Sequence, residues 1–307
     1  MSAPIIVYGS LAYDVQLGSE RSLAEVAAEA AEAKETALCC VRASPIAFGG
    51  NGGNIAWHLA LLKKSPMLIS TMGHDGAQYL ERLKSVGIDT SHIAQRTDCP
   101  TTTIWLVTDQ KTEGSIAFYD DRASRTRRWT AKEEDATSAI VLVGPGKPDV
   151  TLSAMNAVHG RARHVIWDPG QDVHAFKKEE VLTCLEHTTI LVLNSAEFAT
   201  FQRMLGMDGG GMLAKVPVII ETRGKDGARM TARGATAIDI PAAKPKTAVS
   251  SWGAGDAFRS GMLLGLSEKP DDIPYAIRTG YALASLVLEI EGTQLPSLRE
   301  QHIIDRL

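Results

Sequence analysis

A glycine-rich turn that leads into a helical pattern is the strongest chemical signal in the chain. The turn consists of Gly253, Ala254, Gly255 and Asp256, and apolar residues at helical spacing follow it as far as Leu266. Free N–H groups and the dipole at a helix N-terminus can hold phosphate oxygens and stabilise charge on a transferred phosphoryl group. Asp256 is placed to accept a proton from an attacking alcohol. An ordinary capping aspartate is the competing interpretation, and the tetrapeptide alone does not separate the two.

A second loop is rich in glycine and asparagine and precedes a helical pattern over residues 55–64. Glycine occupies positions 49, 50, 52 and 53, and Asn51 and Asn54 lie among them. Glycines permit close backbone approach, and amide side chains both donate and accept hydrogen bonds. Ligands with several hydroxyl groups need that combination, although a loop with a helix cap would also explain it.

Two common nucleotide-binding motifs are absent. Counted from either Gly49 or Gly50, the loop fails the spacing G-x-G-x-x-G, and it does not directly follow the first predicted strand. The segment 144–148 resembles a Walker A sequence but has the wrong spacing and a proline after its lysine. These departures exclude a P-loop kinase and argue against a dehydrogenase.

Short β-branched segments alternate with helix-length segments along most of the chain. Strands are predicted at residues 5–8, 67–71, 140–143, 164–167, 189–193 and 218–222, and helices at 54–64, 77–86, 196–205, 256–266 and 274–289. This alternation predicts an α/β protein with a mostly parallel central sheet and helices on both faces. Ligands of such sheets bind at the carboxyl ends of the strands.

One region breaks the alternation. Residues 102–108 and 115–119 have strand patterns and are joined by a polar link, which predicts a hairpin. A hairpin between βα units would project from the main sheet and could cover the substrate as part of a lid. Only one of its faces can line a pocket, because neighbouring strand residues point to opposite sides.

The stretch from Leu23 to Leu38 is rich in alanine and glutamate and predicts an exposed amphipathic helix.

Composition limits the class of protein. Of the 307 residues, 44% are hydrophobic and 22% charged, which allows a large core. The net charge of -4 offers no broad positive field for nucleic acid or an anionic membrane, so a small-molecule substrate is expected. The four cysteines lack disulfide density and C-x-x-C spacing, so we expect reduced thiols and a cytoplasmic location. The eight histidines form no H-E-x-x-H pair, so no metal ligand is assigned among them.

Taken together, these motifs resemble those of the ribokinase-like family, also called the PfkB family, of sugar and nucleoside kinases. The resemblance covers nearly the whole chain. Gly49, Gly50 and Asn54 match the substrate signature, and Asp14 matches a contact to a substrate hydroxyl. The segment 253–256 matches the anion hole and catalytic base. Asn194 and Glu197 match the N-x-x-E motif that positions magnesium through water, and Thr222, Gly224 and Gly227 match the nucleotide-binding turn.

The resemblance implies a ribokinase-like α/β fold in one domain spanning residues 1–307. It also implies a small β lid from about residues 10–50 and 95–125, with ATP and Mg²⁺ as cofactors. Taken singly the lesser motifs have simpler explanations, because Asn194 could merely cap a helix and residues 222–227 could be a hairpin turn. A homodimer is a candidate assembly, and neither the sequence nor the resemblance decides the oligomeric state.

The segment just before the anion hole departs from the family pattern. Ser250 and Ser251, followed by Trp252, stand where the family usually has Asp-Thr before one further residue. In relatives this segment helps to build a monovalent-cation site, so the missing carboxylate puts potassium activation in question. Trp252 could stack near the nucleotide, but packing in the core is the favoured interpretation.

Three softer features resemble the adenosine or nucleoside kinase subgroup: residues 168–171, the Phe258-Arg259 extension and residues 292–294. We therefore expect an ATP-dependent kinase that phosphorylates a primary hydroxyl of a small sugar-like acceptor, with a nucleoside such as adenosine favoured. A sugar kinase acting on ribose or fructose is the first alternative. A non-catalytic binding or regulatory homologue, motivated by the Ser250 to Trp252 segment, is the second.

Overall fold

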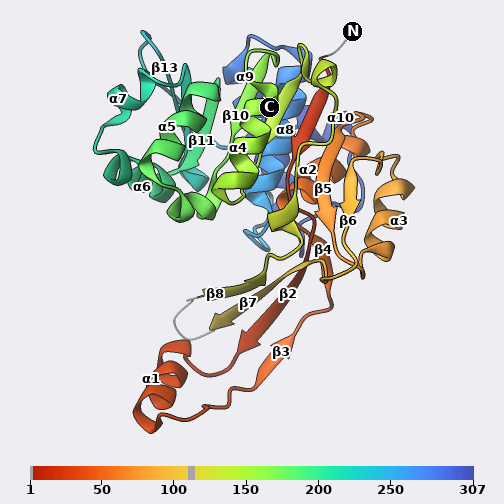
Figure 1. The fold of residues 1–307 in the computed structure, drawn as a ribbon, viewed down its shortest axis with the longest axis vertical. Coiled ribbons are helices and arrows are strands. Elements are labelled where there is room, and N and C mark those ends of the chain that lie inside the picture. The colour runs from red at the N-terminus through yellow and green to blue at the C-terminus, as the bar shows by residue number, and fades with distance from the viewer. Residues whose placement is uncertain (1–2, 110–114) are drawn as a thin grey trace.

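The alternating segments form one large, mostly parallel sheet. The computed structural model describes residues 3–109 and 115–307, and Figure 1 shows its fold. In spatial order the strands described in this sheet are β14 (Ile238–Ile240), β13 (Ala228–Ala232), β12 (Val218–Thr222), β11 (Ile190–Asn194), β10 (His164–Trp167), β9 (Ile140–Val143), β1 (Ile5–Tyr8), β5 (Met67–Met72) and β6 (Ile93–Gln95). From β12 to β6 every neighbouring pair is parallel, whereas β13 and β14 are antiparallel additions at one edge.

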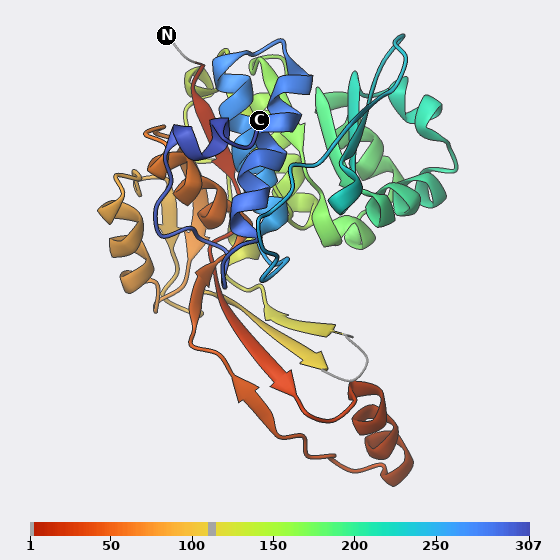
Figure 2. The same ribbon diagram turned by 180° about the vertical axis from the view of Figure 1, so that it is seen from behind.

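Helices cover both faces of this sheet (Figures 1 and 2). One face carries α4 (Pro148–Val158), α5 (Lys178–His187), α6 (Ser195–Leu205) and α7 (Gly209–Leu213); the other carries α2 (Asn51–Leu61), α3 (Ala77–Ser85), α8 (Ala254–Glu268), α9 (Ile273–Val287) and α10 (Glu300–Ile304). Because strand side chains alternate, Ile5 and Val7 of β1 belong to one core, and Ile6 and Tyr8 belong to the other. The predicted three-layer α/β architecture is confirmed.

A second, smaller sheet projects from the main body (Figures 1 and 2). Its strands are β3 (Val41–Ala43), β2 (Ala12–Ser19), β7 (Thr102–Asp109) and β8 (Ser115–Asp120) in this order, and β4 (Ala47–Gly49) also pairs with β2. The predicted hairpin is confirmed by the antiparallel pairing of β7 with β8. Most of its polar link, residues 110–114, lies outside the described residues. All five strands fall within the segments predicted to supply a lid.

Helix α1 (Leu23–Ala33) lies at the tip of the small sheet (Figure 1). None of its residues is buried, as the amphipathic pattern predicted. It is shorter than the predicted helix because Lys34 adopts the left-handed conformation, with φ of 53°, and ends it.

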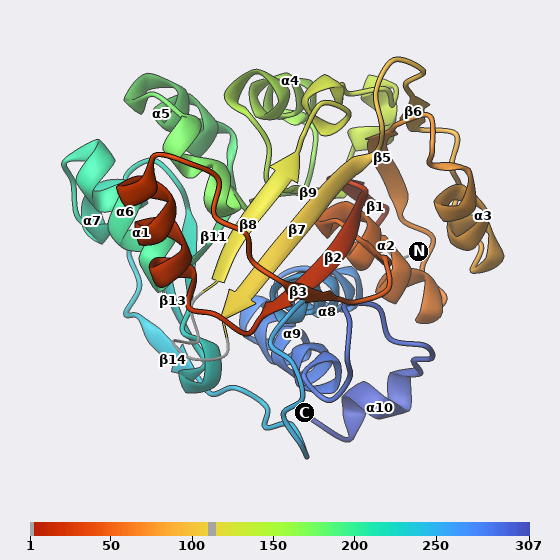
Figure 3. The same ribbon diagram turned by 90° about the horizontal axis from the view of Figure 1, so that it is seen from below.

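Strand β1 is the point at which the order of the large sheet reverses. The chain runs from β1 to β5 and β6 on one side and returns to β9, β10 and β11 on the other. The loops after β1 and β9 therefore diverge, and a crevice forms at the carboxyl ends of these strands. Viewed from below, β2, β7 and β8 lie in front of the centre of the main body (Figure 3).

One expected boundary needs correction, and one alternative left open by the sequence is present in the structure. Helix α2 begins at Asn51 rather than near residue 54 or 55, so Asn51 and Asn54 belong to its first turn. The segment 222–227 ends β12 and turns into the antiparallel β13, which is the hairpin turn considered as its simpler explanation. Short 3₁₀ turns occupy Ser124–Thr126, Glu133–Ala136, Gly170–Ala175 and Gly224–Asp226. None of the described helices has the length and apolar character that a membrane crossing requires.

Candidate active site

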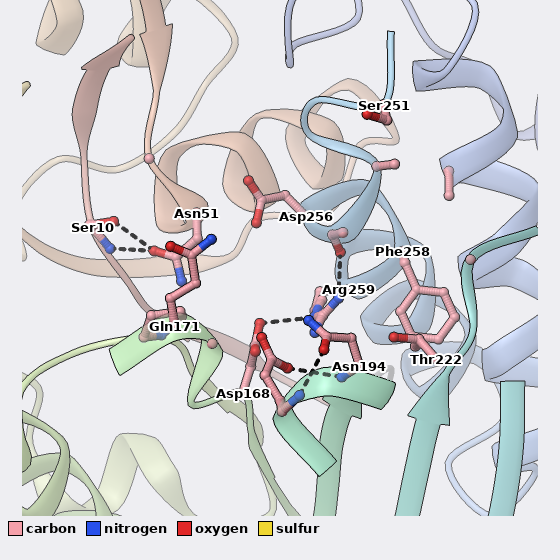
Figure 4. Close-up of a pocket in the computed structure, with 18 of the residues that line it drawn as sticks. Ser10, Asn51, Asp168, Gln171, Asn194, Thr222, Ser251, Asp256, Phe258 and Arg259 are labelled. Atoms are coloured by element: carbon pink, nitrogen blue, oxygen red, sulfur yellow. Dashed lines mark hydrogen bonds and ion pairs between the residues drawn. The ribbon is translucent and has the colours of Figure 1, made fainter. Parts of the chain in front are cut away.

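A cavity of about 910 Å³ opens at the carboxyl ends of the parallel strands. Ser10 after β1, Asn51 of α2 and Gln171 after β10 line one end of it, and Asn194 and Thr222, at the ends of β11 and β12, line the other. Figure 4 shows the side chain of Asp256 between these two groups. Ligand pockets for small molecules typically have volumes of about 300 to 1,000 Å³, so the cavity is at the upper end of that range.

The N-terminus of α8 forms one wall of the cavity. The helix begins at Ala254, and Gly253 precedes it with φ of 78°. A Cβ atom on Gly253 would lie 2.8 Å from Cβ of Thr293, so both its conformation and this close contact require glycine. The first N–H groups of a helix have no carbonyl four residues earlier, so those of Gly255 and Asp256 are available to an anion in the cavity.

Asp256 lies in the first turn of α8 and is partly buried. Burial raises the pKa of its carboxyl to about 6, while the hydrogen bond from Asn54 and the positive charge of Arg259 lower it and the carboxylate of Asp168 raises it. A carboxyl with this pKa is ionised at neutral pH and can still accept a proton, as a general base must.

Asn54 is buried and contacts Asp256 directly. Its Nδ2 donates a hydrogen bond to Oδ2 of Asp256 at 2.7 Å. Its Oδ1 accepts hydrogen bonds from the hydroxyl of Thr293 at 3.0 Å and from Nε2 of Gln294 at 3.2 Å. The amide is therefore engaged at both ends, and Asn54 does not itself line the cavity among the described residues.

Asp14 of β2 lies behind the same wall. It is 5% exposed, and its Oδ1 has no hydrogen-bond partner among the described residues. Burial and the charge of Asp256 raise its pKa to about 7, and a hydrogen bond with Trp252 lowers it. Gly49 must be glycine here, because a Cβ atom would lie 2.0 Å from Oδ2 of Asp14. Trp252 thus contacts Asp14, a predicted substrate-binding residue, and the sequence analysis did not foresee this role.

An arginine of α8 connects the centre of the cavity to two carboxylates. Nε of Arg259 lies 2.9 Å from Oδ2 of Asp168, and both side chains are at most 10% exposed. Burial lowers the pKa of Arg259, but the charges of Asp168, Glu197 and Asp256 outweigh it and raise the pKa. Figure 4 shows Arg259 between Asp256 and Asp168. The cavity therefore contains a permanent cation next to the proposed base.

Asn194 and Glu197 form a reciprocal capping box at the start of α6. The Asn194 side chain accepts from the backbone N–H of Glu197, and the Glu197 carboxylate accepts from the backbone N–H of Asn194, both at 2.9 Å. The motif therefore caps the helix, as its simpler explanation predicted. Both side chains also line the cavity, and burial together with the charge of Asp168 raises the pKa of Glu197.

The carboxylates of Asp168 and Glu197 are chemically suited to a hydrated magnesium ion. Mg²⁺ prefers oxygen ligands and keeps several of its waters, and a divalent cation would relieve the repulsion that raises the pKa of Glu197. The described residues contain no cluster of three or more acidic, histidine or cysteine side chains that could enclose a bare ion. The two carboxylates fit an ion that keeps several of its waters.

The turn after β12 supplies the far end of the cavity. Thr222 and Gly224 line it, together with Lys225 and the segment around Ala243. Gly227 does not line it: this residue, with φ of 85°, closes the turn, and its carbonyl accepts hydrogen bonds from the Arg223 N–H and the Tyr281 hydroxyl. Gly227 shapes the turn and is not itself a cavity residue.

The small sheet supplies apolar surface at the near end. Ile104 of β7 and Tyr119 of β8 face each other in the sheet, and both line the cavity. Trp105 and Phe118, the next facing pair, point to the other side and are 38% and 58% exposed. Nζ of Lys147, in the loop before α4, lies 3.5 Å from the Tyr119 hydroxyl and 3.0 Å from Oδ1 of Asp172.

The structure thus brings most of the predicted site residues to one cavity. Those that line it are Gly50, Asn194, Glu197, Thr222, Gly224, Ala254, Gly255 and Asp256. Asp14, Gly49, Asn54, Gly227 and Gly253 lie outside its described lining and shape or contact those that do. The sequence analysis did not assign Asp168 or Arg259 to the site; both occurred in subgroup patterns that could have drawn attention to them.

Comparison with known proteins gives a consistent result. A family model described as pfkB family carbohydrate kinase matches residues 3–300. A nucleoside kinase of Methanocaldococcus jannaschii is 28% identical over 262 residues, which cover 85% of each chain. A nucleoside kinase of Methanothermobacter thermautotrophicus is 28% identical over 251 residues, which cover 80% of each chain.

Solved structures share the fold over almost the entire length. The crystal structure of the M. jannaschii nucleoside kinase, described as an archaeal member of the ribokinase family, aligns with a TM-score of 0.86 and 25% identity and covers 99% of this chain and 98% of that one. A Burkholderia thailandensis nucleoside kinase in complex with inosine aligns with a TM-score of 0.83 and 23% identity over 98% of this chain and 96% of that one. An Arabidopsis thaliana ribokinase complexed with ribose and ATP aligns with a TM-score of 0.79 and 20% identity, and the alignment covers 99% of this chain and 98% of that one. The predicted ribokinase-like fold is confirmed.

Proposed function

The chain belongs to the pfkB family of carbohydrate kinases and is an ATP-dependent kinase. From this premise we propose that it transfers the γ-phosphoryl group of ATP to the primary hydroxyl of a nucleoside. Adenosine is the first candidate. The observation that carries the proposal is the position of Asp256 midway along one cavity. One end of that cavity lies beside Ile104 and Tyr119, and the other lies beside Asn194 and Thr222. The names of the curated relatives support the same acceptor class.

The near end of the cavity suits a nucleobase attached to a sugar. Tyr119 offers an aromatic face on which a base could stack, and Ile104 adds apolar surface next to it. The side-chain amide of Gln171 can donate and accept hydrogen bonds there. Oδ1 of Asn51 already accepts hydrogen bonds from Ser10 and from the Gly52 N–H, whereas its Nδ2 is a donor that is buried without a hydrogen-bond partner among the described residues. A free pentose would leave the apolar surface uncovered.

Asp256 would act as the general base. Asn54 holds Oδ2, and no described residue is hydrogen-bonded to Oδ1, so Oδ1 can accept the proton of the attacking hydroxyl. Asp14 and the glycines at positions 49 and 50 would form the wall on which the sugar hydroxyls of the acceptor are recognised. The buried, unpaired Oδ1 of Asp14 supports this assignment, because a hydroxyl donor would satisfy it.

The N–H groups at the start of α8 would hold the phosphoryl group during transfer. Those of Gly255 and Asp256 point from a helix N-terminus, whose dipole favours the negative charge that develops on the oxygens. Arg259 adds a nearby cation. When bound, magnesium would neutralise phosphate charge, with Asn194, Glu197 and Asp168 arranging its waters. Thr222 and Gly224 would contact the nucleotide.

The small sheet would serve as a lid over the acceptor. The contact between Lys147 and Tyr119 connects its strand β8 to the main body at the rim of the cavity. Closing of the sheet would exclude water and so suppress ATP hydrolysis without an acceptor. A homodimer and a cytoplasmic location remain predictions from the sequence, and potassium activation remains in question.

A panel of acceptors tests the proposal. Purified protein would be incubated with ATP, Mg²⁺ and adenosine, inosine, ribose or fructose, and ADP formation would be measured to obtain kcat/KM. We expect the nucleosides to exceed ribose by about tenfold or more, since stacking contributes roughly 1 to 3 kcal/mol per base. Preference for a free sugar would refute the assignment of a nucleoside acceptor, but it would not contradict the assignment as a kinase. Ligand-dependent thermal stabilisation without turnover on any acceptor would instead favour a non-catalytic binding protein.

A further inference from the structure

Side chains from three separate segments determine the orientation of the Asn54 amide. Asn54 comes from α2, whereas Thr293 and Gln294 come from the loop after α9, and Arg82 comes from α3. Asn54 and Thr293 are 2% and 4% exposed, so water does not compete freely for their hydrogen bonds. We refer to Arg82, Thr293, Gln294 and Asn54 as the Asn54 relay.

The relay has a defined direction because arginine can only donate hydrogen bonds. Nε of Arg82 donates to Oε1 of Gln294 at 3.1 Å, and the Arg82 guanidinium lies 3.9 Å from the ring centroid of Trp57. The amide nitrogen of Gln294 must then face the other way. It donates to Oδ1 of Asn54 at 3.2 Å and to the Tyr79 hydroxyl at 3.0 Å.

Tyr79 supports the same orientation. Its hydroxyl donates to the carbonyl of Gly49 at 2.7 Å, so it is an acceptor toward Gln294. The Thr293 hydroxyl also donates to Oδ1 of Asn54 at 3.0 Å, which is nearer than its other acceptor, the Phe48 carbonyl, at 3.3 Å. With two donors facing Oδ1, Nδ2 of Asn54 must point to Asp256, where it donates to Oδ2 at 2.7 Å.

We infer that Arg82, Thr293 and Gln294 are positioning residues for Asp256. Acting through the Asn54 amide, they hold Oδ2 of the carboxylate and leave Oδ1 directed to the acceptor hydroxyl. This inference rests on the proposed role of Asp256 as the general base. Thr293, Gln294 and Arg82 are outside the described lining of the cavity, and their hydrogen bonds reach Asp256 through Asn54.

The relay also influences the charge state of Asp256. The charged groups that face this carboxyl are Arg259 on its own helix, Asp168 after β10 and Asp14 on β2. Against burial, which raises the pKa of Asp256, the hydrogen bond from Asn54 and the charge of Arg259 stabilise the ionised form. If the Asn54 amide lost its preferred orientation, the carboxylate would lose a donor and its pKa would rise.

Titration of Asp256 in the substrate-free protein tests the inference independently of activity. The ¹³C signal of its carboxyl would be followed against pH in wild type, Gln294→Met and Thr293→Val, each of which removes a donor with little change of size. Thr293→Ser keeps the hydroxyl, and Gln301→Met changes an exposed glutamine of α10 that contacts Asp305. We expect the midpoint to rise by about half a unit or more in the first two variants and to stay at the wild-type value in the other two. An unchanged midpoint in both Gln294→Met and Thr293→Val would overturn the inference.

Kinetics separate positioning from a purely structural role and from direct acceptor binding. With the best acceptor, positioning predicts that Gln294→Met lowers kcat by about tenfold while KM changes little, and that the acidic limb of kcat/KM moves to higher pH. A structural role would lower Tm and leave the pH midpoint unchanged, and an effect confined to acceptor KM would indicate substrate contact; either result contradicts the inference. If wild type phosphorylates no acceptor, the proposed function fails, but the carboxyl titration still decides whether the relay acts on Asp256.

Discussion

At the level of single residues, the state of Asp256 depends on a balance of opposing effects. Burial raises the pKa of this carboxyl, and the Asn54 hydrogen bond and the Arg259 cation counteract it. The resulting pKa of about 6 leaves the group ionised at neutral pH but basic enough to take a proton. A fully exposed aspartate would be a weaker base, and a buried one without these partners would be neutral.

Replacing Asp256 by asparagine tests the base directly. The amide keeps the shape of the carboxylate but cannot accept a proton, so we expect kcat to fall by on the order of 10²-fold or more. ATP affinity and Tm should stay near wild type. Measurement of kcat with calorimetric ATP binding checks this, and near-normal turnover in the purified variant would exclude Asp256 as the base.

The pH dependence of activity should report the same carboxyl. A general base must be ionised, so kcat/KM should fall as pH decreases through the pKa of Asp256, about 6. Arg259→Met removes a cation that lowers this pKa, and the acidic limb should therefore move to higher pH. Arg203→Met, at an exposed position in the last turn of α6, serves as the control. A limb that stays in place in Arg259→Met would mean that Arg259 does not stabilise the ionised base.

At the level of elements, one motif has both a structural and a proposed chemical role. Asn194 and Glu197 cap α6 reciprocally, and the same Glu197 carboxylate lies in the cavity near Asp168. Because glutamine can also complete a capping box, a change to glutamine separates the two roles.

Glu197→Gln should therefore keep the helix and weaken magnesium use. We expect Tm to change little, since the side-chain oxygen can still accept from the Asn194 N–H. The Mg²⁺ concentration for half-maximal activity should rise severalfold because one negative charge is lost. Asn194→Ala is the contrasting variant, expected to cost about 1 kcal/mol of stability through the lost cap. An unaltered Mg²⁺ requirement in Glu197→Gln would remove Glu197 from the metal site.

Strand alternation decides which lid aromatic can touch an acceptor. Tyr119 lies on the cavity face of β8, whereas Trp105 lies on the opposite face of β7. Tyr119→Ala should raise the KM for a nucleoside by about tenfold, in line with roughly 1 to 3 kcal/mol for stacking. Trp105→Ala, matched in chemistry, should leave that KM within about twofold. A larger rise of KM in Trp105→Ala than in Tyr119→Ala would place the nucleobase on the outer face of the small sheet.

At the level of the whole molecule, the cavity depends on two sheets that are separate in structure but interleaved in sequence. The large sheet supplies the loops after β1, β9, β10, β11 and β12, and the small sheet supplies β7 and β8. The small sheet is inserted on both sides of β5, so its strands meet only after the main sheet has brought the two insertions together. Forming the acceptor end thus requires long-range contacts.

Keeping Asp14 buried should destabilise the ligand-free protein. Its folded pKa of about 7 is above the ordinary value of 3.8. The folded state therefore binds more protons than the unfolded state between these values, and the free energy of unfolding falls as pH rises through that range. Asp14→Asn should be more stable than wild type by about 1 kcal/mol or more at pH 8, with the difference shrinking toward pH 4. Chemical denaturation at several pH values measures this.

Matched experiments separate stability from function for Asp14. Asp305→Asn, an exposed position on the last turn of the chain, should change the unfolding free energy by no more than about 0.5 kcal/mol at any pH. The gain in stability of Asp14→Asn should coincide with weaker acceptor binding, since an amide is a poorer hydroxyl acceptor than a carboxylate. Equal stability of wild type and Asp14→Asn at pH 8 would contradict the prediction that the buried, ionised carboxylate of Asp14 destabilises the folded protein.

The sequence by itself determined the features that depend on neighbouring residues. Strand and helix periodicity predicted the layers of the main sheet, and the Gly253 turn predicted the anion-binding helix end. These are local properties, because alternation and helix capping act over a few residues. Even the errors were local: the start of α2 was placed too late because Asn51 and the following glycines read as a loop, although they continue into the first helical turn.

Only the tertiary structure decided which side chains meet. The hydrogen bond from Asn54 to Asp256 spans 202 positions, and no spacing rule predicts it. The pairing of Arg259 with Asp168, the contact of Trp252 with Asp14 and the choice of the Tyr119 face likewise follow from how α8, β2 and the small sheet pack. Burial and charge at these contacts set the pKa values of the carboxyls, and both depend on distances that exist only once the chain has folded.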